Sequence, residues 1–237
     1  MFEDNYQRLA EVVRRELQGN GRKVVVFDAD GTLWRGDVGE AHLRHLDPCG
    51  QNGDEANAEE PHLIYAKACE EDIEYGYRLG TQLLAPRSEL EVLRSCEDAW
   101  GHHRSETFAY VQPILDEIRS LGGECWVVSA SHRWIIEVAV KDFGIPSDRV
   151  IAGDLWCDSG HLTERVKEPF PNGPGKAAAI HQRIGVKPRI AFGNSMHDVA
   201  MMECASTGVV LWDKSSRHAP LLTLAKARGW FVYEGRV

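Results

Sequence analysis

The stretch VVVFDADGT, residues 24–32, decides how this chain folds. Four consecutive β-branched or aromatic residues without polar alternation predict a strand that is buried on both faces, as in a parallel sheet. Asp28 and Asp30 follow directly, where a simple turn is the alternative interpretation because Asp and Gly are common turn residues. An unpartnered carboxylate beside so apolar a strand costs on the order of several kcal/mol. We therefore expect Asp28 to have a partner, with neutralisation or a metal offsetting this cost.

The same pattern returns in the second half of the chain, where apolar runs alternate with amphipathic segments. Further strands are predicted at 125–128, 189–192 and 209–211. Alternating strands and helices predict an α/β fold with a doubly wound, mostly parallel sheet. Ser129 and Asn194 each follow one of these strands, as Asp28 follows the first. Because ligands bind beyond the carboxyl ends of such strands, we expect the three side chains to converge on one crevice.

The segment between the first strand and residue 108 lacks a convincing strand. Residues 62–104 are predicted to be helical, and residues 47–61 form a loop rich in Gly, Asn and Asp. We therefore expect a helical domain inserted into the α/β core. The predicted boundaries are 1–36 and 106–237 for the core domain and 37–105 for the inserted domain.

Composition excludes several classes of protein. The chain of 237 residues is 43% hydrophobic and carries a net charge of -9, so a folded protein without nucleic-acid affinity is expected. Its apolar runs are far shorter than the roughly 20 residues of a membrane span, and its first residues do not resemble a signal peptide. The six cysteines are scattered, without a Cys-x-x-Cys pair. Reduced thiols and a cytoplasmic location are the expectation.

Four segments, taken together, resemble the motifs of the haloacid dehalogenase superfamily of phosphohydrolases, in the superfamily's order. They are FDADGTL at 27–33, VVSAS at 127–131, Gly-Lys at 175–176 and FGNSMHD at 192–198. The resemblance extends over residues 24–211, nearly the whole chain. It implies a Rossmann-like core, and it implies that the inserted helices are a cap, which in this superfamily commonly closes over the active site.

The resemblance also implies roles for individual residues. Asp28 corresponds to the nucleophile that forms an aspartyl-phosphate, and Asp30 to the general acid and base. The phosphate-binding positions are Thr32, Ser129, the backbone N–H of Ala130, and Lys176. Taken singly, Lys176 would be a solvated helix residue and Ser129 a helix N-cap.

A dianionic phosphate cannot approach two carboxylates without a counter-charge, and the resemblance implies Mg²⁺ as the cofactor. Its ligands would be Asp28, the backbone carbonyl of Asp30, Asp198 and Asn194. The superfamily usually has Asp where this chain has Asn194, so we expect Asn194 to bind through a metal-bound water and the metal affinity to be weaker. His197 is expected on a helix surface.

Residues 28–46 are similar to phosphoserine phosphatases and to bacterial phosphocholine phosphatases. In the former an acidic residue near the position of Asp37 contacts the substrate amine, and this chain has Asp where those enzymes have Glu. Aromatic rings could also hold a cationic head group, although packing in the protein interior is the alternative for each ring. The candidates are Trp34, Tyr65, Tyr75, Tyr77 and Trp100.

The expected function is therefore Mg²⁺-dependent hydrolysis of a small phosphate ester, such as phosphoserine or phosphocholine. A phosphotransferase that passes the phosphoryl group to an alcohol is the alternative. A non-catalytic binding module is disfavoured, because binding alone does not need an acid–base residue at Asp30. The expected partner is a small molecule, with neither nucleic acid nor membrane, and the oligomeric state stays open.

Overall fold

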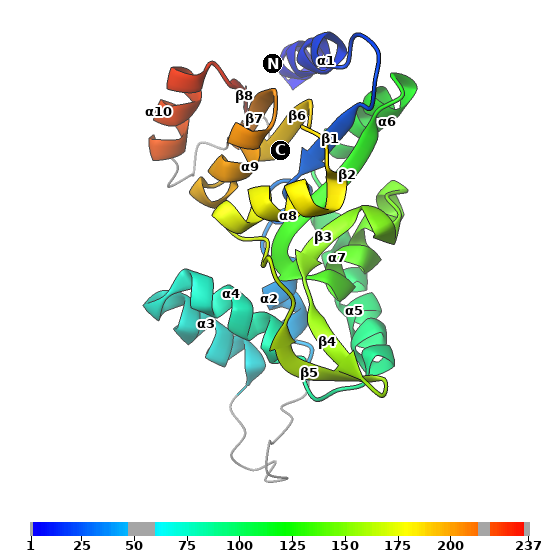
Figure 1. Ribbon diagram of the computed structural model, residues 1–237, viewed down its shortest axis with the longest axis vertical. Helices are drawn as coiled ribbons and strands as arrows, with labels where there is room; N and C mark the ends of the chain where they lie inside the picture. Colours follow the sequence, from blue (N-terminus) through cyan, green and yellow to red (C-terminus); the bar gives the residue numbers. More distant parts are fainter. Residues whose placement is uncertain (1, 47–59, 213–218, 235–237) are drawn as a thin grey trace.

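A six-stranded, wholly parallel sheet forms the centre of the computed structural model, which describes residues 2–46, 60–212 and 219–234 (Figure 1). The strand order is β3-β2-β1-β6-β7-β8. The strands are β1 (Val24–Phe27), β2 (Glu124–His132), β3 (Val150–Gly153), β6 (Ile190–Gly193), β7 (Thr207–Trp212) and β8 (Phe231–Glu234). Because the chain adds strands on one side of β1 and later on the other, the order reverses between β1 and β6. The carboxyl ends of these two strands border the crevice where doubly wound folds bind ligands.

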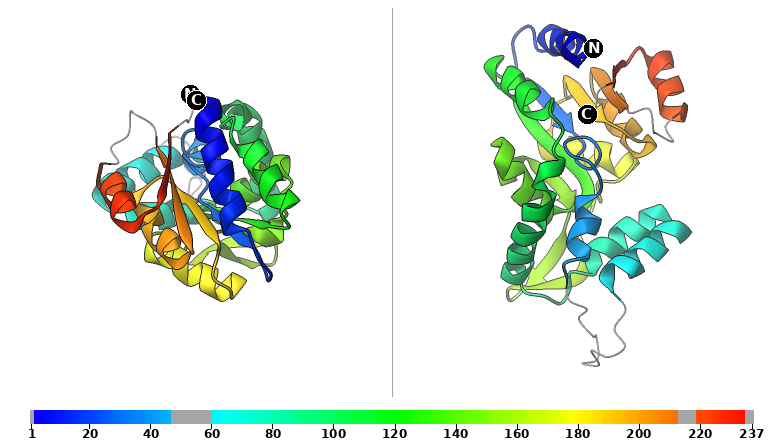
Figure 2. Two further views of the ribbon diagram at one scale, coloured as in Figure 1. Left: turned by 90° about the horizontal axis from the view of Figure 1, so that it is seen from above. Right: turned by 180° about the vertical axis from the view of Figure 1, so that it is seen from behind.

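Helices cover both faces of the sheet (Figure 2). One face carries α1 (Phe2–Glu16), α6 (Val111–Ser120) and α7 (Arg133–Val140), and the other carries α8 (Pro174–Ile184), α9 (Val199–Cys204) and α10 (Ala219–Arg228). Strand β1 shows why: Val25 and Phe27 belong to the first core cluster, and Val24 and Val26 to the second. All four are fully buried, so the predicted α/β fold with a strand buried on both faces is confirmed.

The segment between β1 and α6 is helical, as predicted. It contains α2 (Val38–Leu43), α3 (Pro61–Glu71), α4 (Ile73–Gln82) and α5 (Glu89–His103). Helices α2, α3 and α4 lie beyond the carboxyl ends of the strands, whereas α5 lies alongside α7 (Figure 1). The loop expected at 47–61 lies almost wholly outside the described residues. The domain boundaries at 37 and 105 stay a prediction.

A two-stranded antiparallel hairpin, β4 (Leu155–Asp158) and β5 (His161–Val166), was not predicted. Its turn contains Ser159 and Gly160, both with positive φ, which is the backbone that tight hairpin turns require. Main-chain hydrogen bonds join the hairpin to the start of α5: Glu89 N–H donates to the Gly160 carbonyl and Leu162 N–H to the Arg87 carbonyl. The hairpin therefore connects the α/β core with the inserted helices.

Two expectations from composition can be compared with the described part of the chain. None of its helices has the length and apolar character needed to span a bilayer. The five cysteines that it includes form no disulfide, and Cys49 lies outside it. Four of the five are part of the core or pack against it: Cys69, Cys96, Cys125 and Cys204.

Candidate active site

The predicted site residues surround one cavity of about 320 Å³ at the carboxyl edge of the sheet. Asp28, Ser129 and Asn194 line it together, as the strand ends predicted. Of the nine residues predicted, eight contribute to its walls. The ninth, Thr32, is fully buried and donates a hydrogen bond from Oγ1 to Asp28 Oδ2 at 2.9 Å.

Asp28 is paired with Lys176, the positive charge that the sequence resemblance implies for it. Its Nζ donates to Asp28 Oδ1 and to Asp198 Oδ1, both at 2.6 Å, although the three residues come from three different loops and helices. The side chains are 3% exposed for Lys176, 9% for Asp28 and 2% for Asp198. Burial opposes the charge on Lys176, but the two carboxylates outweigh it and raise its pKa. Lys176 is therefore a fixed ammonium at neutral pH.

The two carboxylates that share Lys176 differ in their ionisation. Burial and the neighbouring charge of Asp198 raise the pKa of Asp28 to about 6. Burial also acts on Asp198, but Lys176 and further hydrogen bonds lower its pKa overall. Asp198 Oδ2 accepts from the N–H of Asn194 at 3.0 Å and from the N–H and the Oγ of Ser195, each at 2.9 Å. Asp198 thus holds the loop after β6 as a permanent anion, while Asp28 is the more basic carboxylate.

Asp30 lies in the same cavity and is held by three donors. Its Oδ1 accepts from Trp34 Nε1 and from the N–H of Val38, each at 2.8 Å, and its Oδ2 accepts from Ser131 Oγ at 2.6 Å. Burial, followed by the nearby charge of Asp37, raises the pKa of Asp30 to about 7. A carboxyl group that gains and loses its proton near neutral pH suits general acid–base catalysis.

Asp37 closes another part of the cavity wall, at the start of α2. Its Oδ1 accepts from the N–H of Glu40 at 2.8 Å, so Asp37 is the N-cap of that helix, and its Oδ2 accepts from the Tyr65 hydroxyl at 3.1 Å. Burial raises the pKa of Asp37. The predicted substrate contact is therefore a fixed hydrogen-bond acceptor that faces the same space as Asp28.

Most of the candidate aromatic rings do not face the cavity. Trp34 and Trp100 are buried in the core, where their rings pack edge to face with centroids 5.1 Å apart. Tyr75 is half exposed on α4. Tyr77 is the candidate ring that lines the main cavity, and Tyr65 reaches it only through Asp37. Packing is thus the correct interpretation for Trp34 and Trp100.

The helix-surface position expected for His197 is wrong. His197 lines the cavity and meets the Tyr77 ring edge to face, with centroids 6.0 Å apart. The reason is the short turn at Met196–Asp198, which is capped by the Ser195 side chain and places His197 beside the cavity before α9 begins. The contact joins α4 of the inserted helices to the loop after β6.

Ser131 and Asn172 line the cavity but were not predicted, because the orientation of their side chains depends on tertiary structure. Ser131 reaches Asp30 across 101 positions of sequence, and its only signal was its place at the end of the second motif segment. Asn172 lines the cavity from the loop before α8, within a Pro-Asn-Gly-Pro stretch that indicates no more than a turn.

The residues around Asp28 fit a hard divalent cation. Asp28 Oδ2 and Asn194 Oδ1 both face the Thr32 hydroxyl, at 2.9 and 3.5 Å, so these two oxygens converge. The candidate ligands offer only oxygen atoms, as Mg²⁺ prefers. Four carboxyl groups line the cavity against one lysine, which leaves an excess of negative charge for a cation to balance. This is the donor chemistry that the sequence resemblance implied.

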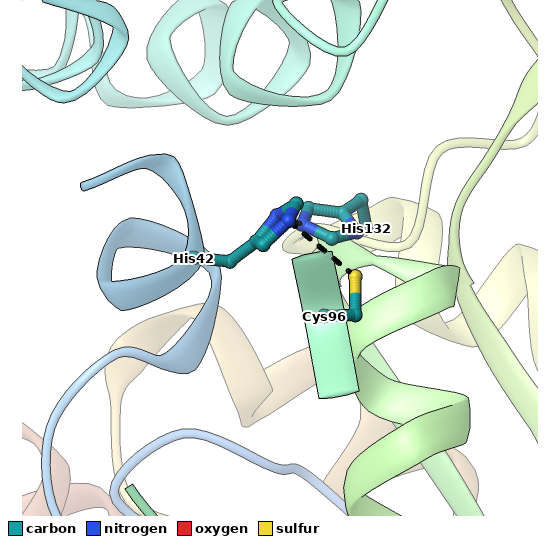
Figure 3. A group of neighbouring side chains, drawn as sticks. All are labelled: His42, Cys96 and His132. Carbon is teal, nitrogen blue, oxygen red and sulfur yellow. Dashed lines mark hydrogen bonds between the residues drawn. The ribbon is translucent and has the colours of Figure 1, made fainter. Parts of the chain in front are cut away.

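A second polar cluster lies outside the cavity and consists of His42, Cys96 and His132 (Figure 3). Its possible ligand atoms lie within 4.8 Å of one another. However, His42 Nδ1 is only 2.9 Å from His132 Nε2, shorter than the roughly 3.3 Å between two nitrogens on a tetrahedral zinc. His42 Nε2 lies 2.9 Å from Ser95 Oγ and 3.6 Å from Cys96 Sγ, so both ring nitrogens of His42 have hydrogen-bond partners in the protein. The geometry is that of a hydrogen-bonded histidine pair.

Comparison with known proteins agrees with this geometry. The family model of the haloacid dehalogenase-like hydrolases matches residues 25–203. The chain belongs to this family. A phosphoserine phosphatase of Mycobacterium tuberculosis is 25% identical over 194 residues, which are 79% of this chain and 44% of that protein. The chain thus spans less than half the length of that relative, so the match concerns only a part of it.

Solved structures share the fold. A protein of unknown function from Bordetella pertussis superposes with a TM-score of 0.75 at 21% identity, covering 90% of this chain and 98% of the other. A phosphoserine phosphatase with an analogue of its phospho-aspartyl intermediate superposes with a TM-score of 0.60 at 19% identity, covering 92% and 95%. The predicted membership of this superfamily is confirmed, and phosphoserine phosphatases are among the proteins to which the chain is similar in sequence and in fold.

Proposed function

We propose that this protein is a Mg²⁺-dependent phosphomonoesterase that hydrolyses a small phosphate ester through an aspartyl-phosphate on Asp28. The observation that carries the proposal is the environment of that carboxylate. Asp28 is buried at the carboxyl end of β1, its Oδ1 is bonded to Lys176, and Asp30 lies in the same cavity with a pKa of about 7. Asp28 as nucleophile and Asp30 as acid–base residue lie side by side in a chain that belongs to a family of hydrolases. This arrangement supports hydrolysis of a phosphate ester through a covalent intermediate.

In the first step, an oxygen of Asp28 attacks phosphorus while the bond from phosphorus to the leaving oxygen breaks. Asp30, in its protonated form, donates its proton to the departing alkoxide, so the alcohol leaves neutral. In the second step, Asp30 takes a proton from water, which attacks the same phosphorus and releases inorganic phosphate. Asp28 is regenerated as a carboxylate, and atoms and charge balance over the cycle.

Acid–base catalysis contributes about 10²- to 10⁴-fold, whereas accelerations of phosphate-monoester hydrolysis reach about 10²¹-fold. Charge stabilisation and positioning must therefore provide most of the effect. Lys176 supplies a fixed positive charge. Ser129 Oγ accepts from the Ser131 N–H at 3.1 Å, which leaves its hydroxyl proton to donate to a phosphoryl oxygen beside the Ala130 N–H.

A bound Mg²⁺ would neutralise phosphoryl charge and hold the phosphorus in line with Asp28. We propose that Asp28, the Asp30 carbonyl, Asn194 and Asp198 form its site. Asp198 would supply a charged ligand oxygen, and Asn194 would contribute through a metal-bound water, as the sequence resemblance implies. Because the Asn194 carboxamide carries no charge, we expect a weaker metal affinity than the usual Asp would give.

The leaving group faces Asp37. With Asp30 protonated, the three remaining carboxylates, one ammonium and one Mg²⁺ leave the cavity with a net charge near 0. The dianionic phosphate then makes the site negative, so a positive group on the alcohol is favoured electrostatically. We propose that the substrate is an amino-acid or amino-alcohol phosphate. The phosphoserine phosphatase among the relatives is consistent with this class.

The test measures phosphate release from phosphoserine, phosphoethanolamine, phosphocholine and p-nitrophenyl phosphate, with and without Mg²⁺. Asp28→Asn keeps the size of the side chain and removes the nucleophilic carboxylate, so we expect at least an about 10³-fold loss of kcat. Thermal melting verifies that the variant is folded. If folded Asp28→Asn released phosphate as fast as the wild type, the aspartyl-phosphate mechanism would be wrong.

A further inference from the structure

Tyr65 of α3 is bonded to the carboxylate that faces the leaving group. Its hydroxyl donates to Asp37 Oδ2 at 3.1 Å, while Asp37 Oδ1 accepts from the Glu40 N–H at 2.8 Å. Tyr65 is 7% exposed, whereas Asp37 is only partly buried and lines the cavity. Each oxygen of the Asp37 carboxylate thus has one protein donor, and each retains the capacity to accept a further hydrogen bond from a ligand.

The packing of α3 against α4 brings Tyr65 to this position (Figure 1). Helix α4 carries Gly76 and Gly80 one turn apart. A Cβ at Gly76 would lie 2.7 Å from the backbone nitrogen of Cys69, and a Cβ at Gly80 would lie 2.7 Å from Cδ2 of Tyr65. Since both distances are shorter than real Cβ contacts, α3 can approach α4 this closely only because both positions are glycine. The Tyr65 ring is held against α4, and its hydroxyl reaches the start of α2.

The hydrogen bond from Tyr65 also affects the charge of Asp37. Burial raises the pKa of Asp37, and the hydrogen bonds from the Glu40 N–H and from the Tyr65 hydroxyl oppose this rise. A donor to a carboxylate stabilises its ionised form. Tyr65 therefore acts on both the orientation and the negative charge of the group that a cationic leaving group would meet.

We propose that Tyr65 is a positioning residue, which orients the Asp37 carboxylate toward a positively charged group on the alcohol part of the substrate. This inference rests on the proposed phosphomonoesterase function and goes beyond it. Tyr65 is not among the described residues that line the main cavity, so it acts through Asp37 and not by contact with the substrate. Removal of its hydroxyl should weaken the binding of cationic esters and leave the phosphoryl chemistry at Asp28 unaltered.

A purely structural role is the competing interpretation, because the Tyr65 ring also packs against α4 and lies 6.4 Å from the Tyr77 ring, centroid to centroid. Loss of that packing would impair the hydrolysis of every ester. Two esters of similar size separate the alternatives, since phosphoethanolamine carries an ammonium group where propyl phosphate carries a methyl group. Only a role through the charge of Asp37 distinguishes between these two esters.

The experiment compares wild type, Tyr65→Phe, Asp37→Asn and the double variant. Phenylalanine keeps the ring and removes the hydroxyl, and asparagine keeps the N-cap acceptor of α2 and removes the charge. We expect Tyr65→Phe to lower the ratio of kcat/KM for phosphoethanolamine over propyl phosphate by about tenfold, through the KM for phosphoethanolamine and not through kcat. Asp37→Asn should lower the ratio at least as much, and the double variant should lower it no further than Asp37→Asn does. Tyr75→Phe, which removes a half-exposed tyrosine hydroxyl from α4, is the matched control, and thermal melting verifies that each variant is folded.

Equal losses for both esters in Tyr65→Phe would overturn the assignment and favour the structural role, and an unaltered ratio would overturn it as well. If the losses in the two single variants added in the double variant, Tyr65 would act independently of Asp37 and the inference would be wrong. If the wild type did not prefer the ammonium ester, or if Asp37→Asn kept the wild-type ratio, Asp37 would not hold a cation. The inference would then fail, although the phosphatase function would stand. If the wild type released phosphate from no ester at all, the proposed function would fail too, and the two failures are thereby distinguished.

Discussion

The cavity around Asp28 and the His42–His132 pair are both buried, titratable and polar, but they differ in how well their hydrogen bonds are met. The cavity sets four carboxyl groups against one lysine, raises the pKa values of Asp28 and Asp30, and leaves Asn172 Oδ1 unpartnered. The histidine pair forms a closed chain. One choice of neutral tautomers lets His132 accept from the Ile135 N–H at 3.4 Å and donate to His42, which donates to Ser95.

Burial lowers the pKa of His42 to about 3 and that of His132 well below its usual value. A strongly perturbed pKa therefore occurs in both places, and it does not by itself identify a functional site. The two places differ in whether their buried polar atoms have hydrogen-bond partners. The histidine pair instead holds the scaffold together, because it joins α2, whose N-cap is Asp37, to the end of β2 beside Ser131.

Removing the lysine should have the largest effect. Lys176→Met leaves Asp28 and Asp198 buried without a counter-charge, so we expect at least an about 10³-fold loss of kcat and a destabilisation of about 3–5 kcal/mol at pH 8. Without the ammonium, both carboxyl groups gain raised pKa values in the folded state. Stability of the variant should then recover as the pH falls from 8 to 5 and the carboxylates take up protons.

Urea unfolding at pH 8 and pH 5, together with phosphate release, measures both effects. Lys176→Arg retains the charge and serves as the matched control. A Lys176→Met protein that is as stable as wild type at pH 8 would show that the three charges do not form one cluster.

The histidine pair predicts a smaller effect of opposite sign with pH. The folded pKa of His42 lies below the unfolded value of about 6.5, so between about pH 6.5 and 3 the unfolded state binds a proton that the folded state does not. The stability contributed by His42 is complete above pH 6.5 and falls by about 1.4 kcal/mol per pH unit below it. Asp28 and Asp30, with raised pKa values, act in the opposite direction over part of this range.

The variant His42→Asn separates these contributions, since it removes one titrating ring and keeps an acceptor near Nδ1. We expect a loss of about 1–3 kcal/mol at pH 7 and a smaller difference from wild type at pH 4.5. Urea unfolding at several pH values measures the difference. If the difference in unfolding free energy between wild type and variant were constant from pH 7 to 4.5, the pKa of His42 would be the same in the folded and unfolded states. The arrangement of neutral, hydrogen-bonded histidines would then be wrong.

The same contrast explains how far the sequence could predict the site. Asp28, Ser129 and Asn194 could be placed together because an unbroken aliphatic run specifies a buried strand, and parallel strands end at one edge. The ring of Trp34 could not be oriented, because its indole N–H bonds Asp30 while its faces pack on Trp100, and both contacts arise only in the tertiary structure.

Asn172 and the hairpin β4–β5 were beyond prediction for a related reason. A Pro-Asn-Gly-Pro segment specifies a turn, but whether the Asn amide is buried or solvated depends on what packs around it. The hairpin has short, mostly exposed strands, so it lacks the apolar run that identified the sheet. The hydrophobic pattern of the sequence therefore predicts where the strands end. The side-chain hydrogen bonds that distinguish a structural cluster from a functional site become visible only in the three-dimensional structure.

The smallest effect is expected from a substitution that adds a negative charge to the cavity, which increases its difference from the neutral histidine pair. Asn194→Asp restores the carboxylate usual in the family and places it where Asn194 Oδ1 converges with Asp28 Oδ2. We expect the Mg²⁺ concentration for half-maximal phosphate release to fall by about three- to tenfold, because a charged oxygen binds the cation more strongly. Without Mg²⁺, the extra carboxylate beside Asp28 should destabilise the variant through repulsion, so added Mg²⁺ should raise its melting temperature more than it raises that of wild type. An unaltered Mg²⁺ dependence would place the cation away from Asn194.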